Sequence, residues 1–120
     1  YIEQVTQREQ AELGRRMRCF RGDRPPPRIT GRGVVLVDDG LATGVTARAA
    51  LAALRRAEPS RLVFAAPVCA PESRDLLLEE RVADAVVCVA APARFQGVGV
   101  WYDDFTQMTD EEVVQILESA

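Results

Sequence analysis

Three short, nearly continuous apolar runs dominate the pattern of hydrophobic positions along the chain. They cover residues 34–37, 62–68 and 85–90. Valine is the commonest residue in these runs, and segments richer in charged or turn-forming residues separate them. Runs of this length and composition predict strands that are buried on both faces, as in a parallel sheet.

Helical spacing of apolar positions marks the segments around these runs. The predicted helices cover residues 1 to about 20, 45–57, 71 to about 81, and a final segment ending near 119. The positions predicted to face inward are Ala47, Ala50, Leu51 and Leu54 in the second helix, and Leu76, Leu77 and Leu78 in the third. Thr109 and Glu112 have the spacing of a capping box, which predicts the start of the last helix.

Strands that alternate with helices predict an α/β fold, with helices on both faces of a parallel sheet. The 120 residues allow a single domain, residues 1–120, with one modest core. Strands that are apolar on both faces would make an open sheet edge prone to aggregation. We therefore expect the sheet to be incomplete here, with strands supplied by an upstream segment of the same protein or by a partner chain.

The segment from Val34 to Thr46 joins a predicted strand to polar chemistry. Asp38 and Asp39 follow the strand, a loop of small residues comes next, and a helix then begins. Loop N–H groups at a helix N-terminus can hold a phosphate, while carboxylates can accept hydrogen bonds from sugar hydroxyls or help to hold a hard cation. An ordinary turn is the alternative, but adjacent like charges repel, so stability alone would not favour them. The segment predicts a site for a phosphorylated sugar.

The same thirteen residues resemble the signature of type I phosphoribosyltransferases, which bind phosphoribosyl pyrophosphate (PRPP). In that family two acidic residues close a strand, and a Thr-Gly-containing loop holds the 5'-phosphate. The resemblance implies the type I phosphoribosyltransferase fold, which is Rossmann-like. It covers nearly all of this chain but only about half of a family domain, so the chain is expected to be the C-terminal part of one, closest to predicted, uncharacterised bacterial members.

The resemblance also implies roles for individual residues. Asp38 and Asp39 would contact the ribose hydroxyls. The 5'-phosphate loop would consist of Ala42, Thr43, Gly44, Val45 and Thr46. The cofactor would be Mg²⁺, held by Asp38, Asp39 and Asp103 either indirectly or through PRPP. Purine-salvage members place an acid at the position of Ala42, which argues against a hypoxanthine-guanine enzyme. No catalytic residue and no pyrophosphate loop can be named.

An aromatic segment follows the third predicted strand. Residues 92–105 are predicted to form a hood over the loop and to set the choice of acceptor. By resemblance, Phe95 would stack on a base, although packing is an equally good interpretation of this residue. For Trp101 and Phe105 we favour packing in the hood or core.

Composition removes several kinds of chemistry. The chain has no histidine and no lysine, which excludes a Ser-His-Asp triad, a histidine-ligated zinc site and a Schiff base. The net charge of −3 argues against a nucleic-acid surface, and no apolar run is long enough to cross a bilayer. Cys19, Cys69 and Cys88 are expected to be small, buried free thiols in a reducing cytoplasm, which is the expected location.

Two functions from different classes remain at this point. The first is a Mg²⁺-dependent enzyme that transfers the phosphoribosyl group of PRPP to or from a nitrogenous base. The second is a non-catalytic module on the same fold that senses PRPP or a nucleotide. The expected ligand is PRPP or a nucleoside monophosphate, no membrane partner is expected, and a homo-oligomer stays open.

Overall fold

The computed structural model describes all 120 residues and divides the chain into two compact units. One is continuous, residues 28–105, and is called the sheet unit below; the other joins residues 1–27 to residues 106–120 and is called the helical unit. The helical elements are α1 (Ile2–Arg21), α2 (Val45–Arg56), α3 (Pro71–Glu79), the 3₁₀ turn η1 (Gly99–Trp101) and α4 (Asp110–Ser119). The strands are β1 (Gly33–Val37), β2 (Arg61–Val68) and β3 (Ala85–Ala90). The predicted helices and strands are therefore all present. None of the helices has the length and apolar character that crossing a membrane requires.

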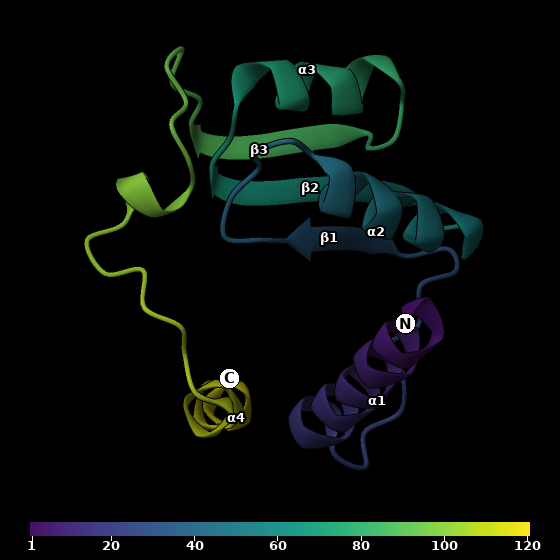
Figure 1. Ribbon diagram of the computed structural model, residues 1–120. Helices are drawn as coiled ribbons and strands as arrows, with labels where there is room; N and C mark the ends of the chain where they lie inside the picture. Colours follow the sequence, from purple (N-terminus) through teal and green to yellow (C-terminus); the bar gives the residue numbers. More distant parts are fainter. The chain divides into compact units, whose positions relative to one another are not determined.

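The sheet unit is built on a parallel sheet in the order β1-β2-β3 (Figure 1). Leu36 of β1 pairs with Phe64 of β2, and Phe64 pairs in turn with Val86 of β3. All three strands end on the same side of the sheet, and the segment after β3 leaves from that side. The predicted α/β class with a parallel sheet is confirmed, and β1 lies at one edge of the three strands.

One hydrophobic core lies between one face of the sheet and two helices. Alternate residues of β2 are buried in it, with Phe64 fully enclosed. Leu51 of α2 and Leu77 of α3 belong to the same cluster, so both helices cover the same face. At helical spacing three consecutive residues cannot share a face, and the prediction that all three leucines of α3 point inward is wrong: Leu76 and Leu78 are exposed.

The opposite face of the sheet carries valines that are exposed. They are Val35 and Val37 of β1, and Val87 and Val89 of β3. The prediction that these strands are buried on both faces is therefore wrong within these residues, because α2 and α3 lie together on the other face. The completion of the sheet by another segment or chain stays a prediction.

A disulfide joins the ends of two neighbouring strands. Cys69 directly follows β2, Cys88 lies in β3, and their Cα atoms are 6.1 Å apart. The expectation of buried free thiols is wrong for this pair: the disulfide forms although the strand register sets Ala66, and not Cys69, opposite Cys88. Cys19, on α1, is a free thiol as expected, but the prediction that it is buried is wrong, because α1 has no buried residue and Cys19 is exposed.

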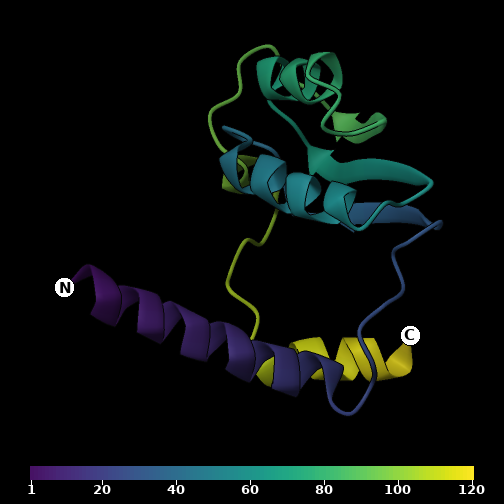
Figure 2. The ribbon, with the colours of Figure 1, turned by 90° about the vertical axis from the view of Figure 1, so that its right-hand side faces the viewer.

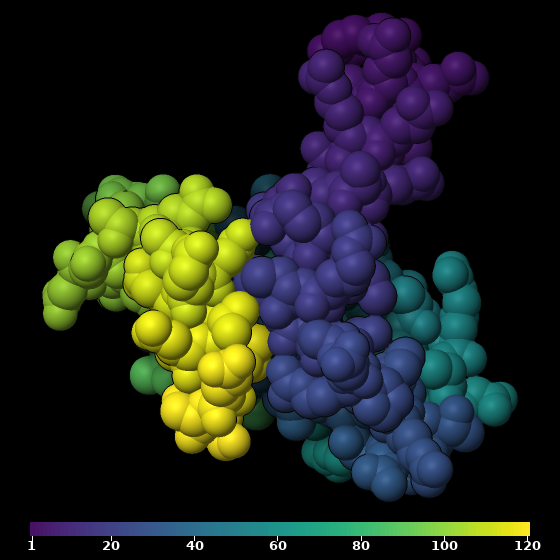
Figure 3. Space-filling view, turned by 90° about the horizontal axis from the view of Figure 1, so that it is seen from below, coloured from purple at the N-terminus to yellow at the C-terminus, as the bar shows by residue number.

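The helical unit pairs the two ends of the chain. α4 packs beside the C-terminal part of α1 (Figures 2 and 3), and Arg15 of α1 donates a hydrogen bond to the Asp110 carboxylate at 2.6 Å. The predicted capping box is present: the Glu112 N–H donates to the Thr109 hydroxyl, and the Thr109 N–H donates to the Glu112 carboxylate.

Candidate functional site

The acidic pair lies where β1 ends. The Asp38 N–H still donates to the Ala65 carbonyl of β2 at 3.1 Å, so this residue continues the strand pairing. The Asp39 N–H then donates to the Asp38 carboxylate at 2.8 Å and turns the chain out of the sheet. Both aspartates thus lie at the carboxyl end of a parallel strand, as predicted.

The pKa of the Asp39 carboxyl is shifted by its surroundings. Partial burial raises the pKa of the Asp39 carboxyl above its ordinary value, and the negative charge and hydrogen bonding of Asp38 raise it further. A proton or a cation at Asp39 would relieve this repulsion.

The loop after the acidic pair is held to the sheet at its middle. Leu41 is buried, its N–H donates to the Val68 carbonyl at 2.9 Å, and its carbonyl accepts from the Ala70 N–H at 2.7 Å. The Ser73 hydroxyl of α3 donates to the Ala42 carbonyl. Strand β2 and helix α3 therefore fix the loop before α2 begins.

The N-terminus of α2 presents uncapped backbone donors. Gly44 is the N-cap, with φ +81° and ψ 2°, a left-handed conformation that favours glycine. The first turn contains no acidic side chain and no side-chain cap, in contrast to α4. The first bond of the helix runs from the Arg48 N–H to the Gly44 carbonyl, which leaves the N–H groups of residues 45–47 for an external acceptor. A bound anion can satisfy them.

These parts surround one cavity of about 220 Å³. Its walls are the contiguous residues 38–47 and the side chain of Val98 from the segment after β3. Every loop residue predicted for the 5'-phosphate, from Ala42 to Thr46, thus lies together with both carboxylates.

Two other predicted site residues do not line this cavity. Phe95 is half-buried in the connection after β3, and Asp103 is exposed beyond η1. The structure gathers no group of three or more acidic, cysteine or histidine side chains that could hold a metal ion. Any cation at Asp38 and Asp39 would take most of its ligands from substrate and water, which is a usual mode of Mg²⁺ binding.

Three residues that reach the loop were not named individually as site residues from the sequence, although Val98 and Tyr102 lie in the predicted hood. Val98 walls the cavity, the Tyr102 hydroxyl donates to the Asp39 carbonyl at 2.6 Å, and Ser73 holds Ala42. A serine in the first turn of α3 gives no signal of this contact. Trp101 and Phe105 are not core residues, because both are about half exposed. Phe105 packs on the ring of Tyr102, and the two ring centroids are 5.0 Å apart.

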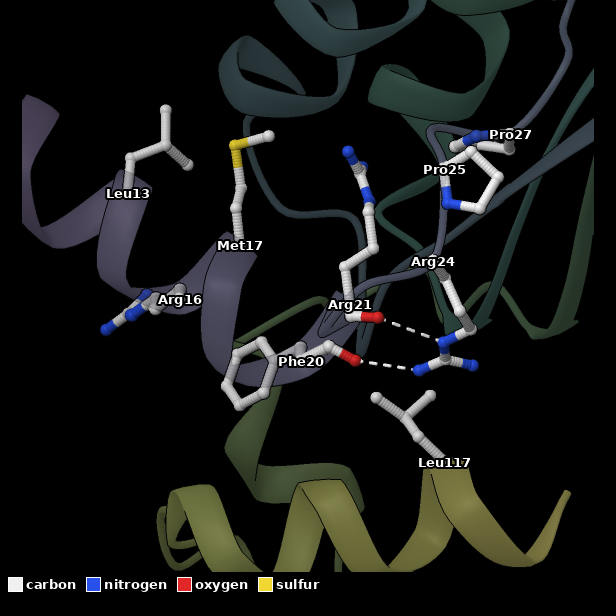
Figure 4. A pocket seen from close by; sticks show the side chains of 9 residues that line it. All are labelled: Leu13, Arg16, Met17, Phe20, Arg21, Arg24, Pro25, Pro27 and Leu117. Carbon is white, nitrogen blue, oxygen red and sulfur yellow. Dashed lines mark hydrogen bonds between the residues drawn. The ribbon is translucent and has the colours of Figure 1, made fainter.

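A second cavity, of about 540 Å³, belongs to the helical unit (Figure 4). It is lined by apolar side chains and arginines but by no acidic residue. Arg24 donates to the carbonyls of Phe20 and Arg21, and Arg16 is paired with Glu12. Two of its three guanidinium groups are therefore already engaged.

The sequence profile of the phosphoribosyl transferase domain family matches residues 2–104. The chain belongs to this family. Two curated Mycobacterium tuberculosis proteins, from strains CDC 1551 / Oshkosh and ATCC 25618 / H37Rv, each carry the name "Putative phosphoribosyl transferase". Both are 42% identical over 120 residues, which is 99% of this chain and 26% of each relative. The crystal structure of TT1426 from Thermus thermophilus matches with a TM-score of 0.81 and 40% identity, over 99% of this chain and 56% of that one.

This phosphoribosyl transferase chain therefore spans about a quarter of the length of its curated relatives and just over half of its structural neighbour. The family match includes the whole acidic loop and most of the segment after β3. The fold is that of the family, and the predicted membership of the type I group is confirmed.

Proposed function

We propose that this chain forms the ribose- and 5'-phosphate-binding part of an enzyme that transfers a phosphoribosyl group between PRPP and a nitrogenous base. The observation that carries the proposal is the cavity at the end of β1. It combines two carboxylates, the uncapped N-terminus of α2 and a loop fixed by neighbouring elements. Membership of the phosphoribosyl transferase family supports the same chemistry.

Each part of the cavity has a task in this reaction. The N–H groups at the start of α2 would hold the 5'-phosphate, and the exposed hydroxyls of Thr43 and Thr46 add donors at the same place. Asp38 and Asp39 would accept hydrogen bonds from the ribose hydroxyls. Held at both ends, the sugar would present its anomeric carbon in a fixed orientation, which is how positioning lowers a barrier without a protein nucleophile.

The donor set is compatible with Mg²⁺ as the cofactor. Asp38 and Asp39 would hold it together with substrate oxygens, and a bound cation would neutralise charge on the departing pyrophosphate. The cavity contains no histidine, lysine or cysteine. Proton transfer to or from the base would therefore involve water, the substrate or a residue outside this cavity.

The test is a titration of the full-length protein with PRPP, followed by a screen of bases for pyrophosphate release. The double variant Asp38→Asn/Asp39→Asn should bind PRPP about 10–100-fold more weakly, because hydrogen bonds to charged groups are lost. The double variant Asp23→Asn/Asp75→Asn removes the same charge from exposed positions and should bind normally. Equal PRPP affinity in the two variants would refute the assignment.

The same experiment separates the enzyme from a sensor. Asp38 and Asp39 are the only ionisable side chains that line the cavity. Residues that bind and position a ligand would serve a PRPP or nucleotide sensor as well as an enzyme. Tight PRPP binding, with no pyrophosphate released from PRPP in the presence of any base, would favour the sensor.

A further inference from the structure

The turn η1 and its two flanking residues touch the acidic end of the cavity. Val98, just before η1, is the one lining residue that comes from outside residues 38–47. Tyr102, just after η1, donates its hydroxyl to the carbonyl of Asp39 at 2.6 Å. Two contacts, one apolar and one polar, thus join segments about sixty residues apart.

The apolar contact depends on a glycine. A Cβ atom built on Gly40 would lie 2.4 Å and 2.6 Å from the two methyl carbons of Val98, so only glycine allows this approach. Gly40 does not have a positive φ, so its lack of a side chain, and not its backbone freedom, is what the contact uses.

The polar contact orients a peptide group. Because the peptide is planar, fixing the Asp39 carbonyl fixes the N–H of Gly40 in the opposite direction. The Tyr102 ring is itself packed against Phe105, and a Cβ on Gly99 would meet the Phe105 ring at 2.9 Å. The Phe105 ring therefore packs against both Gly99 and Tyr102, and this packing holds the turn that carries the Tyr102 hydroxyl.

From these contacts we propose that Tyr102 is a positioning residue for the ribose site. Its hydroxyl holds the Asp39–Gly40 peptide, and with Val98 it makes the turn at residues 98–102 respond to a ligand bound in the cavity. This inference rests on the proposed function, since it assigns the ligand as the sugar phosphate. It implies that occupation of the PRPP cavity orders the segment that lies next to it.

The test compares two tyrosine variants of the full-length protein. Tyr102→Phe removes the hydroxyl and keeps the ring on Phe105, while Tyr1→Phe removes a hydroxyl from a side chain that is 96% exposed. Loss of one hydrogen bond predicts about 3–10-fold weaker PRPP binding for Tyr102→Phe and no change for Tyr1→Phe. In turnover, KM for PRPP should rise more than kcat falls. Equal PRPP affinity in both variants would overturn the proposal.

Hydrogen exchange gives a reading that a merely structural role would not produce. In the Tyr1→Phe protein, PRPP should slow exchange in residues 39–44 and also in 98–102. In Tyr102→Phe, the response at 39–44 should remain and the response at 98–102 should be lost. If both segments still respond, the coupling is refuted.

Failure of the proposed function would be recognised separately. If PRPP does not bind even the unmodified protein, exchange without ligand still decides the contact: residues 39–44 should exchange faster in Tyr102→Phe than in Tyr1→Phe, and equal rates would overturn it. If Tyr102→Phe does not fold, Val98→Ala tests the apolar half of the contact, with Val89→Ala as the control because Val89 is 89% exposed. Residues 39–44 should exchange faster in Val98→Ala than in Val89→Ala, and equal rates would overturn the docking of the turn on the loop.

Discussion

The contact between Gly40 and Val98 makes a quantitative prediction for the stability of Gly40→Ala. The added methyl group would lie 2.4 Å and 2.6 Å from two carbons of Val98, far inside normal contact distance. Overpacking of this kind costs about 1–3 kcal/mol. Replacing glycine also removes about 0.4–1 kcal/mol of chain entropy from the unfolded state, which acts in the opposite direction. The expected net loss, taken from the middle of the two ranges, is therefore about 1.3 kcal/mol.

Val98→Ala should relieve most of this cost. The nearest remaining atom would be the Val98 Cβ, 3.0 Å from the new methyl group, and a shift of a few tenths of an ångström accommodates it. In the Val98→Ala background, Gly40→Ala should therefore be close to neutral. The coupling energy between the two substitutions should be about 1–3 kcal/mol.

The assay is urea unfolding of the full-length protein for the two single variants and the double variant. Gly33→Ala is the matched control, because a Cβ there meets nothing within 4 Å and Gly33 has no positive φ. It should be neutral or stabilising by up to about 1 kcal/mol. If Gly40→Ala costs the same with and without the Val98 methyl groups, Val98 does not lie on Gly40 and the docking of η1 on the loop is wrong.

Two further predictions concern the fold. The Asp84 carboxylate accepts from the Leu62 N–H at 2.7 Å and from Arg55, and this bonding holds its pKa below the ordinary value of 3.8. A depressed pKa stabilises the fold above that value, and the contribution is lost as pH falls below it. The unfolding midpoint of Asp84→Asn should thus lie below that of the unmodified protein at pH 7, and the gap should close in acid; a constant gap would contradict the linkage. Thr109→Ala removes the capping box of α4 and should cost about 1 kcal/mol, seen as faster amide exchange in α4, whereas Thr6→Ala, on an exposed helical position, should leave that exchange unchanged.

Local patterns predicted most of the fold and the main part of the site. The acidic pair and its loop are contiguous, so strand, turn and helix signals within thirteen residues place them together. The capping box at Thr109 is local in the same way. Such features depend on near neighbours in sequence, and the structure agrees with them.

Contacts between distant segments could not be predicted in this way. The Tyr102 hydroxyl reaches Asp39 across 63 positions, along an irregular segment whose path no periodicity specifies. The disulfide joins Cys69 to Cys88, 19 positions further along, and the apolar runs do not predict that these two residues approach each other. The exposed valines, such as Val89 at 89% exposure, show that apolar content alone does not tell which face is covered.

The composition of the helical unit from both ends of the chain has a consequence for folding during translation. Arg15 and Asp110 are 95 positions apart in the sequence. The whole sheet unit, residues 28–105, is therefore synthesised after α1 and before α4. At about 5–20 residues per second, α1 leaves the ribosome on the order of 5–20 s before α4. The sheet unit is continuous and can close within that interval. During that interval α1 lacks the helix that it pairs with, so the nascent chain is the stage at which α1 is most open to association with other chains.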